Sequence, residues 1–144
     1  MIRGGEPPLS ASLYVVATPI GHLDDMSLRA IDVLRRVNVI AAEDTRHSSR
    51  LLRHFDIRTP LISYHDHSEA SDLEGMLKRL RADETIALIS DAGTPLVSDP
   101  GYKLVVACHR EQIPVVPIPG PSATITALSA AGLPTDHFYF EGFL

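Results

Sequence analysis

Four short stretches rich in Gly, Pro, Ser, Thr and Asp contain the residues of this sequence that could bind a ligand or do chemistry. They are ATPIGHLDD (17–25), AEDTR (42–46), SDAGTP (90–95) and PGPSA (119–123). The third continues as SDAGTPLVSDPG to residue 101, and irregular connections of this length are uncommon in compact domains unless they have a function. Ligands of open parallel sheets bind beyond the carboxyl ends of the strands, so four such stretches could together form one pocket.

Individual residues in these stretches have both a binding and a structural interpretation. Asp91 could accept hydrogen bonds from a ribose or an ammonium group, and Ser122 at a helix start offers a hydroxyl and free N–H groups that suit an anion. Gly93 and Gly120 would let the backbone approach a ligand closely. Taken singly, Asp91 is more often a turn former and Ser122 an ordinary N-cap, so only the coincidence of four stretches favours binding. The first stretch is not a G-x-G-x-x-G fingerprint and no Walker lysine is present, which argues against standard dinucleotide and triphosphate sites.

The second stretch leads into a helix-like segment with a basic side. Arg46, Arg50 and Arg53 lie opposite the apolar residues of segment 46–55. Such a stripe is usually only a solvated surface. Because Arg46 follows Glu43 and Asp44 in a loop at a strand end, these three residues and Arg50 are candidates for contacting a phosphate-bearing substrate.

Two further features concern metal and thiol chemistry. In an extended chain His65 and His67 would point to one side, with Glu69 near. However, no further Cys or His follows at ligand spacing, so we predict a solvated or partner-facing loop and no metal site. The single cysteine, Cys108, lies in an apolar run and is predicted to be a core residue rather than a nucleophile. One cysteine excludes an internal disulfide framework and fits a reducing cytoplasm.

Alternating apolar segments must position these stretches. Five are short and apolar and predict strands at 13–17, 39–42, 61–64, 85–89 and 113–118. Helical spacing predicts helices between them, at 27–37, 46–55, 71–80 and 122–131. The fold class is therefore α/β, with a mainly parallel five-stranded sheet flanked by helices.

Several residues predict how these elements begin or end. Ser71 and Glu74 have the spacing of a capping box, and Asp99 followed by Pro100 predicts the N-cap and first position of another helix. Prolines at 114 and 117 predict an edge strand or a bulge. The apolar segment 137–144 reads as one more strand, which suggests that the chain is the first domain of a longer one.

The composition fits one folded domain. The chain has 144 residues, with 44% hydrophobic and 22% charged residues, and it has no apolar run long enough for a membrane span. We interpret residues 1–12 as a disordered leader that is too polar for a signal peptide. The net charge of −5 argues against a general nucleic-acid-binding surface but not against a local basic patch.

The sequence resembles a known family at VVATPIGHLDDMSLRA, IAAEDTR, YHDH, SDAGTPLVSDPG, IPGPSA and FEGFL, in this order. These stretches resemble the tetrapyrrole (corrin/porphyrin) methylase superfamily, a class of S-adenosylmethionine-dependent methyltransferases. Within it they are similar to the ribosomal RNA small subunit methyltransferase I group. Members are about twice as long as this chain, so the resemblance implies that residues 13–144 are the N-terminal α/β domain of a two-domain enzyme whose C-terminal domain is absent here.

The resemblance also implies a cofactor site. In that family S-adenosylmethionine lies between the two domains, where the loops after the first, fourth and fifth strands of the N-terminal domain hold it. Carried onto this sequence, the matching positions are Pro19, Ile20, Asp91, Thr94, Ser122 and Ala123.

The implied activity is methyl transfer to the 2′-hydroxyl of a cytidine in 16S ribosomal RNA of the small subunit, by a homodimer. Tetrapyrrole-methylating relatives carry a Gly-rich first loop, whereas ATPIG has a single glycine, which favours RNA. Two alternatives stay open: a small-molecule, tetrapyrrole-type methyltransferase, and a non-catalytic ligand-binding module. No motif identifies the catalytic base. Loop position alone suggests Glu43 or Asp44, with Arg46 holding a phosphate.

Overall fold

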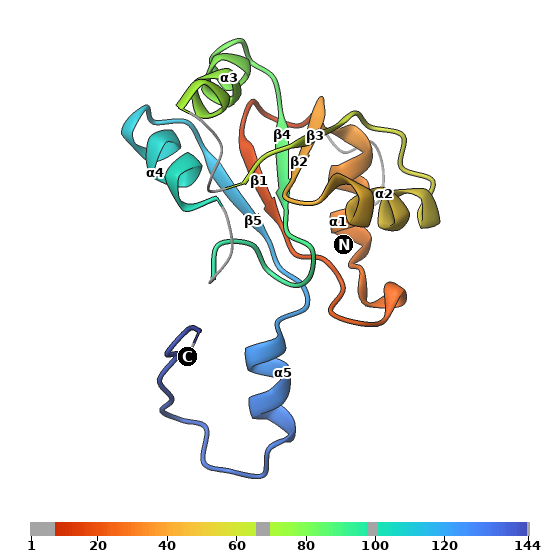
Figure 1. Ribbon diagram of the computed structural model, residues 1–144, viewed down its shortest axis with the longest axis vertical. Coiled ribbons are helices and arrows are strands. Elements are labelled where there is room, and N and C mark those ends of the chain that lie inside the picture. The colour runs from red at the N-terminus through yellow and green to blue at the C-terminus, as the bar shows by residue number, and fades with distance from the viewer. Residues whose placement is uncertain (1–7, 66–69, 98–100, 144) are drawn as a thin grey trace.

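The computed structural model describes residues 8–65, 70–97 and 101–143. Within them lies a five-stranded sheet with the order β3-β2-β4-β1-β5, in which every pair of neighbours is parallel. The order confirms the predicted α/β class, and β4 inserts between β1 and β2 (Figure 1). The strands are β1 (Leu13–Val16), β2 (Val39–Ala42), β3 (Leu61–Ser63), β4 (Ile86–Ile89) and β5 (Val115–Ile118).

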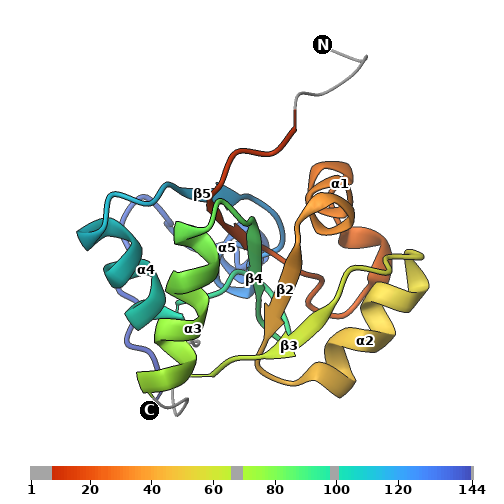
Figure 2. The ribbon, with the colours of Figure 1, turned by 90° about the horizontal axis from the view of Figure 1, so that it is seen from above.

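Helices cover both faces of this sheet. Seen from above, α1 and α2 lie on one side and α3 and α4 on the other, while α5 lies apart from both layers (Figures 1 and 2). No helix in the described residues is both long enough and apolar enough to cross a membrane. The elements are the 3-10 turn η1 (Leu23–Asp25) and the helices α1 (Leu28–Arg36), α2 (Thr45–His54), α3 (Ala70–Arg81), α4 (Tyr102–Arg110) and α5 (Ala123–Ala130).

Residue alternation along the strands divides the core into two layers. In β1, Tyr14 and Val16 pack with α1 and α2, whereas Leu13 and Val15 pack with α3 and α4. The three central strands are apolar and buried along their whole length, because helices cover them on both faces. Cys108 belongs to the second layer and is fully buried, as predicted.

Two predicted helix starts are wrong. The helix expected to begin with a Ser71 cap begins one residue earlier, at Ala70, so Ser71 lies inside it. Glu74, the other residue of the predicted capping box, forms an ion pair with Arg81. The N-cap of α4 is Gly101, at a φ of 119°, with no side-chain cap. Asp99 and Pro100, predicted to open this helix, lie outside the described residues.

Predictions were also made for the edge of the sheet and for both ends of the chain. β5 is an edge strand, as its prolines predicted. The strand predicted for 137–144 is wrong, since residues 137–143 form no strand and are exposed; Leu144 lies outside the described residues. Residues 1–7 of the predicted leader lie outside them as well. In the rest of that segment, Leu9 packs against the core and Ser12 is fully buried.

Candidate functional site

The sheet topology creates a crevice at the carboxyl ends of β1 and β4. These strands are neighbours, but the chain leaves β1 towards α1 on one face and leaves β4 towards α4 on the other (Figure 2). Loops that diverge in this way open a gap between them, which is where open α/β sheets bind their ligands. The crevice is therefore the expected site, and the candidate residues of the β1, β4 and β5 loops meet there.

Hydrogen bonds join the three loops. Thr18 and Gly93 form an antiparallel bridge, in which the Thr18 amide donates to the Gly93 carbonyl at 2.9 Å and the Gly93 amide donates to the Thr18 carbonyl at 3.0 Å. The Thr18 hydroxyl donates to the Ser90 carbonyl at 3.3 Å. From the β4 loop, the Thr94 hydroxyl reaches the Pro121 carbonyl of the β5 loop at 3.1 Å. These hydrogen bonds hold the β1, β4 and β5 loops together.

The two glycines singled out in these loops serve different purposes. Gly93 has a φ of 79°, which side-chain-bearing residues rarely adopt, and it lines the larger cavity of the crevice. A Cβ on Gly120 would lie 2.9 Å from the Cβ of Ala17 at the end of β1. Gly120 therefore allows the β5 loop to pack against β1, rather than a ligand to approach the backbone.

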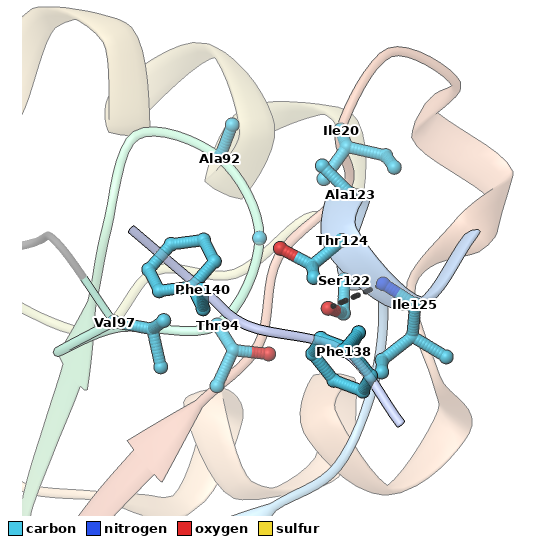
Figure 3. Close-up of a pocket in the computed structure, with 11 residues that line it drawn as sticks. Ile20, Ala92, Thr94, Val97, Ser122, Ala123, Thr124, Ile125, Phe138 and Phe140 are labelled. Carbon is cyan, nitrogen blue, oxygen red and sulfur yellow. Dashed lines mark hydrogen bonds between the residues drawn. The ribbon is translucent and has the colours of Figure 1, made fainter. Parts of the chain in front are cut away.

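The larger cavity has a volume of about 510 Å³, which is ample for a nucleoside-sized ligand. Figure 3 shows the hydroxyls of Thr94, Thr124 and Ser122 among apolar side chains. The Ser122 hydroxyl also accepts the Ile125 amide as the N-cap of α5, at 3.4 Å, so its binding and structural interpretations both apply. The lining residues are Ile20, Ala92, Gly93, Thr94, Val97, Ser122, Ala123, Thr124, Ile125, Phe138 and Phe140.

The six residues carried over as cofactor contacts do not all face this cavity. Ile20, Thr94, Ser122 and Ala123 line it, but Pro19 and Asp91 line a second cavity of about 290 Å³ beside α2. The candidate residues are therefore divided between two neighbouring cavities. Pro19 and Asp91 line the smaller cavity, whereas the residues that follow them, Ile20 and Ala92, line the larger one, so the β1 and β4 loops lie between the two cavities. The smaller cavity is lined by Pro19, Gly21, Leu23, His47, Arg50, Leu51 and Asp91.

The candidate substrate residues lie at the start of α2. Asp44 is the N-cap of this helix and accepts hydrogen bonds from the amides of His47, at 3.2 Å, and Arg46, at 2.9 Å. These bonds lower the pKa of its carboxyl group. A carboxylate stabilised in this way is a weak base, which disfavours Asp44 as a proton acceptor. Glu43 and Arg46 are exposed beside it, and Arg50 reaches the smaller cavity.

Sequence analysis missed several lining residues. Phe138 and Phe140 come from the segment after α5, where their spacing of two places both side chains on one side of an extended chain. That alternation was a usable signal. His47 had no such signal, since only the packing of α2 against the β1 loop brings it to the smaller cavity. His67 and Glu69 of the rejected metal site lie outside the described residues.

Cys108 and the His and acidic side chains of the described residues were considered for thiol and metal chemistry. Burial raises the pKa of the Cys108 thiol to about 11, which keeps it protonated and unreactive. In residues 8–65, 70–97 and 101–143, no group of three His, Cys, Asp or Glu side chains could hold a metal ion.

A parallel α/β domain with a ligand-sized crevice at its switch point defines a class of small-molecule-binding domains. Comparison with known families narrows this class. The model of the Tetrapyrrole (Corrin/Porphyrin) Methylases matches residues 12–144, and the chain belongs to this family.

Individual relatives agree with that assignment. Two proteins named ribosomal RNA small subunit methyltransferase I, from Synechocystis sp. and Escherichia coli O157:H7, are each 58% identical over 132 residues. The alignments cover 92% of this chain but only 47% and 46% of those proteins, so the chain spans slightly less than half of their length.

Solved structures show the same fold at low identity. A uroporphyrin-III-C-methyltransferase from Thermus thermophilus superposes with a TM-score of 0.64 at 24% identity, covering 88% of this chain and 54% of that one. A structure of that enzyme complexed with S-adenosylhomocysteine gives 0.59 at 23% identity, with the same coverage. A cobalt precorrin-4 methyltransferase gives 0.61 at 16% identity, covering 84% of this chain and 50% of that one.

Proposed function

We propose that this chain is the cofactor-binding part of an S-adenosylmethionine-dependent methyltransferase that modifies the 2′-hydroxyl of a cytidine in 16S ribosomal RNA of the small subunit. The observation that carries the proposal is the larger cavity, built by the β1, β4 and β5 loops at the topological switch point. The substrate follows from relatives of more than 50% identity, whose names specify ribosomal RNA of the small subunit.

The lining of the larger cavity fits such a cofactor. Ile20, Val97, Phe138 and Phe140 offer apolar surface for an adenine ring, and Phe138 and Phe140 remain about half exposed at 54% and 45%. Hydroxyls of Thr94, Ser122 and Thr124 can bond to ribose and amino-acid groups (Figure 3). The start of α5 adds partly unpaired N–H groups that favour a carboxylate.

In a methyl transfer of this kind the main role of the protein is to position the reacting groups. When bound, the cofactor supplies a methyl group on a positively charged sulfur. The residues of this chain would hold the cofactor and shield it from water, and the proton of the ribose hydroxyl would have to leave to a base or to water. Holding the reacting atoms about 3–3.5 Å apart and in line supplies much of the acceleration. The bridge between Thr18 and Gly93 holds the β1 and β4 loops beside the cavity at a fixed spacing.

Calorimetric titration with S-adenosylhomocysteine tests the cofactor site through a matched pair of variants. Thr124 lines the larger cavity, and Thr126 is exposed on the same helix. Loss of one hydrogen bond of about 0.5–1.5 kcal/mol should make Thr124→Val bind about 2- to 10-fold more weakly. Thr126→Val should bind like the wild type. Equal affinities of both variants and the wild type would contradict the assigned cavity.

Labelling with methyl-labelled S-adenosylmethionine tests the substrate. Small ribosomal subunits and a tetrapyrrole are offered side by side to the whole protein that carries this chain. We expect label only in 16S RNA, as 2′-O-methylcytidine. Label in the tetrapyrrole alone would establish the small-molecule alternative, and cofactor binding without transfer to either would establish the non-catalytic one.

Residues 1–144 by themselves should bind cofactor weakly and should not methylate RNA. All the candidate residues come from this one domain, and exclusion of water from the reacting atoms needs a cover over the crevice. Methylation by this fragment at a rate near that of the whole protein would refute this expectation.

The protein is proposed to act as a homodimer in the cytoplasm. α5 has small side chains, no buried residue and an exposed Ile125, so it can pack closely against another surface. The free and buried Cys108 fits a reducing compartment. Light scattering of the whole protein at micromolar concentration should give the mass of a dimer, and a monomer would count against this proposal.

A further inference from the structure

The smaller cavity lies beside the proposed cofactor site but on the other side of the β1 and β4 loops. Pro19 and Asp91 line it, whereas the residues that follow them, Ile20 and Ala92, line the larger cavity. The two loops are joined by an antiparallel bridge and form a wall between the cavities. A volume of about 290 Å³ on the α2 side of this wall is therefore not used by a cofactor in the larger cavity.

The wall limits which part of an RNA strand can use the smaller cavity. In-line transfer needs the reacting ribose oxygen about 3–3.5 Å from the methyl carbon, so the acceptor nucleotide must enter on the side of the larger cavity. A strand that crosses the rim of the wall from there brings the next nucleotide over the smaller cavity. A nucleotide in the smaller cavity can thus be held by the protein, but it cannot react.

The α2 side of the smaller cavity is positively charged. The ten residues of α2 include three arginines and two histidines but no carboxylate, in a chain of net charge −5. Among the described residues, Arg46, Arg50 and Arg53 form no ion pair, in contrast to the arginines of α3, which pair with glutamates. Arg50 and His47 line the cavity, and Arg46 lies one turn before Arg50 on the same side. Exposed cations without a partner suit the phosphates of RNA.

The β4 side of the smaller cavity presents a hydrogen-bond acceptor. Asp91 lines the cavity, and its Oδ1 atom is enclosed without a hydrogen-bond partner among the described residues. An enclosed carboxylate oxygen without a donor is unfavourable, so a hydroxyl that donates to it would be bound selectively. A phosphate would be repelled by Asp91 and by the exposed Asp24 and Asp25 of η1. The cavity thus favours a phosphate at α2 and a hydroxyl at Asp91.

We infer that the smaller cavity holds the nucleotide next to the acceptor in the RNA strand, with its 2′-hydroxyl donating to Asp91 and its flanking phosphates bound by Arg46 and Arg50. This inference rests on the proposed function and deepens it. It assigns Asp91 to the RNA rather than to the cofactor, and it gives the basic side of α2 a ligand. Because the 2′-hydroxyl distinguishes RNA from DNA, this nucleotide is recognised as RNA although it is not methylated.

The first test measures RNA binding by the whole protein at several salt concentrations, using a single-stranded oligonucleotide that carries the acceptor sequence. The variant Arg46→Ala/Arg50→Ala removes both phosphate contacts. The control Lys78→Ala/Arg110→Ala removes the same charge from exposed positions of α3 and α4, on the opposite face of the sheet (Figure 2). Loss of two contacts should reduce the slope of log affinity against log salt by about 1.4, at about 0.7 per contact. The control should keep the slope of the wild type.

The second test asks whether the protein recognises the 2′-hydroxyl of a nucleotide that does not react. Oligonucleotides with one 2′-deoxy substitution, at the nucleotide before or after the acceptor, are compared with the unmodified RNA and with a control substituted far from the acceptor. The hydroxyl of the acceptor itself is kept. We expect one of the two neighbouring substitutions to weaken binding to the wild type at least about tenfold, because a hydrogen bond to a charged acceptor is lost. The distant substitution should have no such effect.

Removal of the acceptor should abolish this discrimination. Asp91→Ala should bind the neighbour-substituted oligonucleotide and the unmodified RNA equally, since neither can then donate a hydrogen bond at this position. The variant should also bind S-adenosylhomocysteine with the affinity of the wild type and keep its far-ultraviolet circular dichroism. The comparison of oligonucleotides on the wild type needs no variant, so it decides the matter even if Asp91→Ala does not fold.

The outcomes distinguish this inference from the proposed function. A wild type that does not methylate small subunits refutes the proposed function. Equal binding of all oligonucleotides by the wild type, or no binding of RNA, overturns the neighbour site, and so does a folded Asp91→Ala that still discriminates. Equal salt slopes for the two double variants overturn the phosphate contacts. A loss of S-adenosylhomocysteine affinity in folded Asp91→Ala overturns the inference too, because Asp91 would then contact the cofactor.

Discussion

Replacing Gly101 with alanine should destabilise the fold by about 1–5 kcal/mol. Gly101 ends the segment SDAGTPLVSDPG and is the N-cap of α4, at a φ of 119° that residues with a Cβ avoid. An added Cβ would lie 2.5 Å from Cδ2 of Leu88. Leu88 is 1% exposed in the central strand β4, so its side chain has no room to move.

The magnitude follows from two costs and one gain. Overpacking a core typically costs about 1–3 kcal/mol, and holding a residue in a disfavoured backbone region costs about 1–3 kcal/mol. The smaller entropy of the unfolded alanine chain returns about 0.4–1 kcal/mol. Gly75 provides the matched control, since it is exposed inside α3 and an added Cβ would meet nothing within 4 Å. Gly75→Ala should stabilise by about 0.5–1 kcal/mol because alanine favours the helix.

Urea titration followed by far-ultraviolet circular dichroism measures both variants. With a dependence of about 1.5 kcal/mol per M, a loss of 3 kcal/mol lowers the midpoint by about 2 M for Gly101→Ala. The Gly75→Ala midpoint should rise. If both variants shift in the same direction, or if Gly101→Ala keeps the wild-type midpoint, the reasoning from φ and from the contact with Leu88 is refuted.

Three further predictions concern caps, charge and the buried thiol. Asp44→Ala should lower the melting temperature at pH 7, because the lowered pKa of the Asp44 carboxyl means that the ionised cap stabilises the fold at pH values above its ordinary pKa of 3.8. The difference in melting temperature from the wild type should shrink as the pH falls below 3.8. A difference that grows in acid would contradict this prediction. Ser27→Ala should cost about 1 kcal/mol in urea titrations, because the Ser27 hydroxyl caps α1 by accepting the Ala30 amide at 3.0 Å. Cys108, with its pKa raised to about 11, should resist a thiol reagent at pH 8 until the protein is unfolded, and rapid labelling of the native protein would refute its burial.

The sequence predicted the strands and most of the helices because their signals are local. Leu13–Val16 and Ile86–Ile89 are short apolar runs, and the helices begin at recognisable caps such as Ser27 and Ser122. The errors lie at helix starts where a competing interaction determines the first helical residue. Ser71 could have capped its helix, but the helix begins at Ala70, and Glu74 pairs with Arg81.

The site was predicted less completely because it depends on which way each loop residue faces. The Thr18–Gly93 bridge joins residues far apart in the sequence, and no periodicity reveals it. Once formed, it fixes Ile20 on one side of the wall and Asp91 on the other. Motif resemblance indicated the three loops that line the larger cavity, but it did not separate the two cavities.

The edges of the sheet bear on how this protein behaves at high concentration. β3 is an edge of only three residues, and β5 is the other edge. The carbonyls of Pro114 and Ile118 accept hydrogen bonds from β1, so the backbone of Pro117, one residue before Ile118, faces away from the sheet. There proline offers no N–H to an incoming strand. Neither edge can readily extend the sheet into a neighbouring molecule, which protects against aggregation through strand addition.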